Sequence, residues 1–115
     1  MPKNKFRFDW VLVDELAIGT APSLSSSISE LKDNGIVSIL SLCSNQEVEL
    51  PDELNNKFLW KRVVLPDHTY GTLPDFADLM NAINVLEGFQ NNLPTFVHCV
   101  AAMERSPLVC MAWLI

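Results

Sequence analysis

The chain has 115 residues, 49% of them hydrophobic, and its 14 acidic and 8 basic side chains leave a formal net charge of −6. This length fits a single domain over residues 1–115 with a packed core, and it excludes a multidomain architecture. The acidic balance, with no basic run along the chain, argues against nucleic acid as a partner.

The N-terminal sequence and the cysteine content favour a location in the cytoplasm. No apolar stretch follows residues 1–5 as a secretory signal would require, and no run approaches the ~20 apolar residues that cross a bilayer. Three cysteines without paired spacing favour a reducing environment, so we expect a cytoplasmic protein with no membrane contact. Two histidines and the absence of a Cys-x-x-Cys motif argue against a zinc site, and we expect no metal and no cofactor.

The apolar pattern alternates between runs of strand length and stretches of helical period. A helical stretch that begins at Ser25 ends at the stop signal Asn34-Gly35. The run 36–42 is mostly apolar, as in a buried parallel strand. The longest helical stretch has Pro74 in its first turn. The predicted elements are strands 10–13 and 16–18, helix 25–34, strand 36–42, a helical turn at 51–54, strand 58–64, helix 73–90, strand 94–98 and a helix from Arg105 onward.

Strands that alternate with helices predict an α/β fold: a mainly parallel central sheet of about five strands, flanked by helices. Open sheets of this kind bind ligands beyond the carboxyl ends of their strands. Two predicted loops follow such strand ends, at 66–72 and at 99–104.

The second of these loops carries residues suited to nucleophilic chemistry. A buried strand ends at Cys99, five residues follow, and a helix begins at Arg105. A tight loop at a helix start directs backbone N–H groups inward and forms an anion site, which the helix dipole reinforces. A thiol over that site is acidified to a nucleophilic thiolate, and arginine can donate to two phosphate oxygens. The plain alternative is a buried cysteine and a surface arginine, because Cys-x5-Arg alone is a weak signal.

The segment His98-Cys99-Val100-Ala101-Ala102-Met103-Glu104-Arg105-Ser106 resembles the HC-x5-R-S signature of cysteine-dependent protein phosphatases, in their dual-specificity branch. Upstream blocks follow the layout of that family in the same order, so the resemblance covers about residues 10–115. These blocks are Leu16–Gly19, Leu31–Ile36, Ile39–Cys43 and Leu65–His68.

The resemblance implies hydrolysis of a phosphomonoester in two steps, without a metal. Cys99 would attack phosphorus and form a phosphocysteine, and Asp67 would act as general acid and then as general base. Ser106 would donate a hydrogen bond to the sulfur, and His98 would support the loop from behind. The phosphate would be bound by Val100, Ala101, Ala102, Met103, Glu104 and Arg105.

Asp67 has a plainer interpretation and two rivals for the role of the acid. An aspartate after proline is common in turns, and Pro66 precedes Asp67. Asp75 is explained by the dipole of the predicted helix 73–90, and Asp78 as a residue on that helix's surface. The match to the family's general-acid loop favours Asp67.

Two residues of the loop depart from the commonest pattern of the family. Ala102 stands where the family usually has glycine, and alanine at positive φ costs of order 1 kcal/mol. Glu104 precedes the arginine and is expected to face outward or to support the N-terminus of the helix. The loop also lacks the lysines of phosphoinositide-directed relatives, which favours a phosphoprotein substrate over an inositol lipid.

We therefore expect a phosphoprotein phosphatase that acts on phosphotyrosine, with phosphoserine, phosphothreonine and small phosphomonoesters as further substrates. The alternative is a catalytically weak, phosphate-binding pseudophosphatase or a fragment; a rhodanese-like sulfur carrier is disfavoured by His98, Ser106 and the place of Asp67. Cys43 is either a small buried side chain or a thiol that traps oxidised Cys99 as a disulfide. The chain stops within an apolar helical pattern, so we expect a C-terminally truncated form of the domain. The oligomeric state leaves no trace in the sequence.

Overall fold

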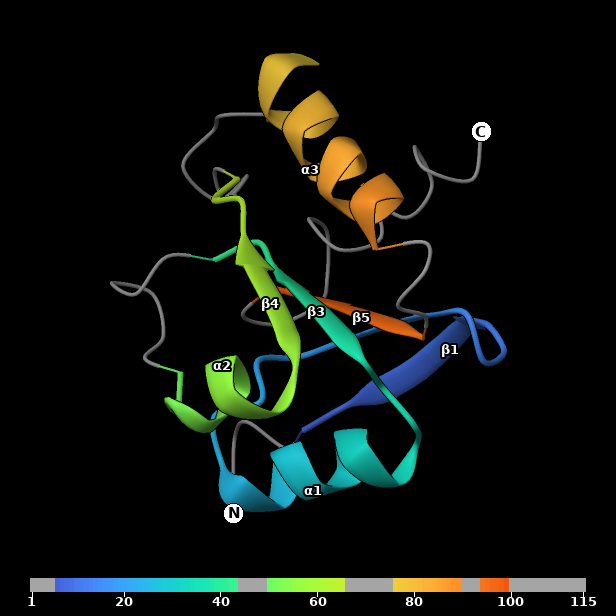
Figure 1. The fold of residues 1–115 in the computed structure, drawn as a ribbon, viewed down its shortest axis with the longest axis vertical. Coiled ribbons are helices and arrows are strands. Elements are labelled where there is room, and N and C mark those ends of the chain that lie inside the picture. The colour runs from blue at the N-terminus through green and yellow to red at the C-terminus, as the bar shows by residue number, and fades with distance from the viewer. Residues whose placement is uncertain (1–5, 44–49, 66–75, 90–93, 100–115) are drawn as a thin grey trace.

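The computed structural model describes residues 6–43, 50–65, 76–89 and 94–99. Within these ranges one five-stranded sheet has helices packed against it (Figure 1). In chain order the elements are β1 (Phe8–Leu12), β2 (Leu16–Gly19), α1 (Ser25–Asp33), β3 (Ser38–Ser41), α2 (Glu53–Lys57), β4 (Leu59–Arg62), α3 (Phe76–Gly88) and β5 (Thr95–His98).

The strand order is β1-β2-β5-β3-β4. β1 pairs antiparallel with β2, and the pairs β2–β5, β5–β3 and β3–β4 are all parallel. The predicted α/β class, with a mainly parallel sheet of about five strands, is therefore confirmed. No helix within the described parts of the chain has the length and apolar character to cross a membrane.

Each predicted element within the described ranges is present, with shifted bounds. The predicted strand 36–42 is longer than β3, yet its outer residues still bond to the β5 segment: the N–H of Val37 donates to the oxygen of Pro94, and that of Leu42 to the oxygen of His98, both at 2.9 Å. The helical turn predicted at 51–54 is the short helix α2. After α1, Gly35 has a φ of +80°, the left-handed conformation that its stop signal predicts.

The central strands β3 and β5 are buried on both faces, as parallel strands covered by helices usually are. Successive residues of β5 alternate between two cores: Phe96 packs toward α1 and α2, and Val97 packs toward α3 (Figure 1). The α1–α2 core is formed by Ala17, Ile28, Leu31, Ile36, Ile39, Leu54, Phe58 and Phe96. The α3 core is formed by Leu16, Leu40, Leu42, Leu65, Ala82, Leu86, Phe89, Val97 and Cys99.

A polar contact joins the two helices on the first of these faces. Ser25 at the start of α1 donates from Oγ to Oε1 of Glu53 at 3.1 Å, and Lys57 lies 3.2 Å from Oε2 of the same carboxylate. Hydrogen bonds from Lys57 and Ser25 lower the pKa of the exposed Glu53 carboxyl below its ordinary value.

The register of the parallel strands decides what meets at their carboxyl ends. Ser41 of β3 is paired with His98 of β5 on one side and with Arg62 of β4 on the other. β5 is the central strand, so the residue that follows it lies in the middle of this edge. That residue is Cys99.

Candidate active site

β5 positions the predicted nucleophile and the histidine before it on opposite faces of the sheet. Cys99 follows the strand directly, is 2% exposed and belongs to the α3 core. His98 is fully buried, and its ring stacks on Phe96 with a centroid separation of 5.9 Å and an interplanar angle of 20°. The strand thus holds both residues buried at the edge where open α/β sheets bind ligands.

Ser41, which we did not predict as a site residue, contacts His98: its Oγ lies 2.6 Å from His98 Nε2. Trp60, also not predicted, contacts Ser41 in turn, because its indole Nε1 donates to the same Oγ at 2.7 Å. His98 Nδ1 lies 3.4 Å from the carbonyl oxygen of Cys99. A signal for Ser41 was present, since a polar residue in an otherwise apolar, buried strand needs a hydrogen-bond partner.

Cys43 lies two residues after the end of β3, whereas Cys99 follows β5 directly. Both side chains are buried, and neither forms a disulfide. Because β3 and β5 are parallel neighbours, the two cysteines lie at the same edge of the sheet, with Leu42 level with Cys99 and Cys43 one residue further along. The burial of Cys43 agrees with a core residue, and its role as a resolving thiol stays a prediction.

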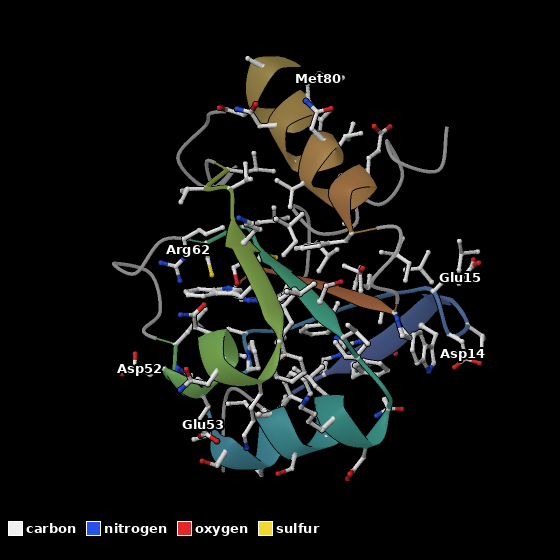
Figure 2. The ribbon with its side chains drawn as sticks, in the orientation of Figure 1. Asp14, Glu15, Asp52, Glu53, Arg62 and Met80 are labelled. Atoms are coloured by element: carbon white, nitrogen blue, oxygen red, sulfur yellow. The ribbon has the colours of Figure 1, made fainter. Side chains whose placement is uncertain are left out.

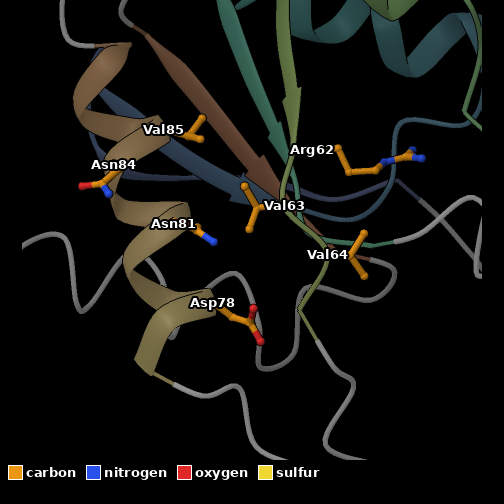
Figure 3. Close-up of a pocket in the computed structure, with 7 residues that line it drawn as sticks. All are labelled: Arg62, Val63, Val64, Asp78, Asn81, Asn84 and Val85. Carbon is orange, nitrogen blue, oxygen red and sulfur yellow. The ribbon is translucent and has the colours of Figure 1, made fainter.

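An open groove of about 580 Å³ lies at this edge, between the end of β4 and α3 (Figure 3). Asp78 and Asn81 project from α3 toward the β4 side, whereas the side chain of Arg62 points away (Figure 3). The Arg62 guanidinium instead lies over the Trp60 ring, 5.1 Å from its centroid, and its place is marked in Figure 2. The walls of the groove are Arg62, Val63, Val64, Asp78, Asn81, Asn84 and Val85.

The groove was not predicted, because its walls come from a strand and a helix that are separated in sequence. We expected Asp78 to be an ordinary residue of the helix surface, and the structure places it in the groove wall. Within the described ranges, no group of three or more histidine, cysteine, aspartate or glutamate side chains is arranged to hold a metal ion. The remaining predicted site residues, Asp67 and Val100 to Ser106, lie outside those ranges.

Comparison with known proteins places this fold among phosphatases. No family model matches the chain. It is 28% identical, over 98% of its length, to the phosphatidylglycerophosphate phosphatase PTPMT2 of Arabidopsis thaliana, and it spans about half (50%) of that curated relative. Kinase-associated phosphatase with its catalytic cysteine replaced by serine superposes with a TM-score of 0.77 at 20% identity, covering 98% of this chain and 75% of that one.

A second solved structure, PTPMT1 in complex with PI(5)P, superposes with a TM-score of 0.73 at 19% identity and covers 88% of this chain and 67% of that one. The chain therefore has the α/β fold of dual-specificity and protein-tyrosine-phosphatase-like enzymes. At the carboxyl edge of that fold it presents a buried cysteine.

Proposed function

We propose that this chain is a phosphatase domain that hydrolyses phosphomonoesters through a phosphocysteine at Cys99. The placement of Cys99, directly after the central parallel strand of a phosphatase-like fold, carries this proposal. The Arabidopsis relative, named as a phosphatase, supports it independently of the fold.

The proposed reaction has two steps. The Cys99 thiolate attacks phosphorus, a P–S bond forms, and the P–O bond to the leaving group breaks while Asp67 gives its proton to the leaving oxygen. Backbone N–H groups of the loop 100–105 and the Arg105 guanidinium stabilise the phosphoryl oxygens. Asp67 then takes a proton from water, which attacks phosphorus and releases phosphate, and Ser106 donates a hydrogen bond to the departing sulfur.

Two substrate classes are candidates. The name of the Arabidopsis relative favours a glycerophospholipid phosphate, of which phosphatidylglycerophosphate is the first choice. The absence of lysine from the loop 100–104 favours a phosphoprotein. Phosphate release from phosphatidylglycerophosphate vesicles and from phosphotyrosine peptides, compared as kcat/KM, distinguishes the two classes.

The chemistry is tested by hydrolysis of para-nitrophenyl phosphate. We expect Cys99→Ser to abolish turnover, and Asp67→Asn to lower kcat by about 10²–10⁴-fold, the usual contribution of a general acid. Cys110→Ser is the control, because this cysteine has no role in the proposed reaction. Undiminished hydrolysis by Cys99→Ser would refute the assignment of the nucleophile.

A phosphate-binding pseudophosphatase is the second candidate, and Ala102 in place of the usual glycine is the feature that favours it. Binding of vanadate by the wild type without turnover of any phosphomonoester would select this alternative.

A further inference from the structure

A series of hydrogen-bonded polar groups crosses the sheet from β4 to β5 at the edge where Cys99 lies. It runs from Trp60 Nε1 to Ser41 Oγ (2.7 Å), from Ser41 Oγ to His98 Nε2 (2.6 Å), and from His98 Nδ1 to the Cys99 carbonyl oxygen (3.4 Å). Ser41 and His98 are fully buried, and Trp60 is partly buried. The edge strand is thereby connected to the peptide unit from which the predicted phosphate loop departs.

The carbonyl oxygen opposite His98 Nδ1 indicates the direction of these hydrogen bonds. A carbonyl oxygen can only accept, so a proton on Nδ1 is needed there. In the neutral ring Nε2 then carries no proton and accepts the hydroxyl proton of Ser41. Ser41 Oγ accepts in turn from the indole N–H of Trp60, which can only donate. In the other neutral tautomer two acceptors would face each other at Nδ1.

We propose that Trp60 and Ser41 are positioning residues that hold His98 as the neutral Nδ1–H tautomer and, through it, fix the carbonyl group of Cys99. Because a peptide unit is planar, a hydrogen bond at its oxygen sets the orientation of the whole unit. The consequence for catalysis rests on the function proposed above, whereas the tautomer does not. Loosening this unit would weaken the hold of the loop on the thiolate and on phosphate.

The tautomer is read by nitrogen-15 NMR of the full chain labelled at histidine. The chain has two histidines, so His68→Gln assigns the signals. We expect wild-type His98 to carry its proton on Nδ1 alone. Ser41→Ala and Trp60→Phe, which remove the hydroxyl and the indole N–H respectively, should each shift the Nε2 signal, and Ser41→Thr should restore the wild-type pattern.

The effect on the nucleophile is read by the rate at which iodoacetamide alkylates Cys99, identified by peptide mass spectrometry. We expect Ser41→Ala to slow alkylation about tenfold, in line with other losses of supporting hydrogen bonds, and Ser41→Thr to remain close to wild type. The matched control is Ser38→Ala. Ser38 Oγ makes a buried 2.6 Å hydrogen bond to Thr95 Oγ1 across the same two strands, at their opposite end. The Ser38→Ala substitution should change neither the His98 NMR signals nor the alkylation rate of Cys99.

An Nε2–H tautomer in the wild type, or signals unchanged in both Ser41→Ala and Trp60→Phe, would overturn the proposal. If Ser38→Ala slows the alkylation of Cys99 as much as Ser41→Ala does, the proposal is overturned too, because the slowing would then come from a general loss of packing. If Ser41→Ala does not fold, the partly exposed Trp60→Phe decides. A wild type without turnover that shows the expected tautomer would refute the proposed function and leave the positioning role standing.

Discussion

Gly19, the last residue of β2, allows the antiparallel edge of the sheet to approach the central strand. A Cβ atom at this position would lie 2.0 Å from the carbonyl oxygen of Arg7 and 2.8 Å from the Phe96 ring. One of these neighbours is backbone and the other is a core ring, so neither can move cheaply. We expect Gly19→Ala to lower the free energy of unfolding by about 1–3 kcal/mol, as other overpacking substitutions do.

Denaturant unfolding measures this loss, with Gly88→Ala as the matched control. A Cβ at Gly88, the last residue of α3, has no neighbour within 4 Å. Alanine there should be neutral or stabilise by about 0.5–1 kcal/mol. The packing argument is wrong if Gly19→Ala is as stable as the control variant.

Among the elements, α1 begins without a side-chain cap. Its N-cap is Leu24, which is 62% exposed, extended at φ −118° and ψ 154°, and unable to accept a hydrogen bond from the first turn. The first turn also has no acidic residue. An aspartate at this position would accept a bond from a first-turn N–H and complement the helix dipole, so we expect Leu24→Asp to stabilise the protein by about 1 kcal/mol.

Thermal unfolding followed by circular dichroism tests this expectation. Leu24→Ala is the control, because it removes the same exposed apolar side chain without supplying an acceptor. A melting temperature of Leu24→Asp that does not exceed that of Leu24→Ala would contradict the capping argument.

At the scale of the whole molecule, the parallel pairing of β3 and β5 brings Cys43 and Cys99 to one edge from distant parts of the sequence. We expect hydrogen peroxide to oxidise the Cys99 thiol to a sulfenic acid, releasing water. The Cys43 thiol then attacks that sulfur, and a disulfide forms with loss of a second water.

Peptide mapping by mass spectrometry detects the linked pair. Cys43→Ala should instead accumulate sulfinic acid at Cys99, whereas Cys110→Ala should still form the disulfide. Sulfinic acid at Cys99 of the wild type, with no link to Cys43, would show that Cys43 is only a core residue.

The sequence by itself determined the class of fold and the place of Cys99, the predicted nucleophile, within it. Apolar periodicity and turn residues are local, so they predicted the strands, the helices and the position of Cys99 at the end of a buried strand. Tertiary structure alone decided the strand order and register, and with them the partners of His98 and the walls of the groove. Ser41 and Trp60 come from two other strands, and which side chains meet across strands depends on long-range pairing that no local pattern encodes.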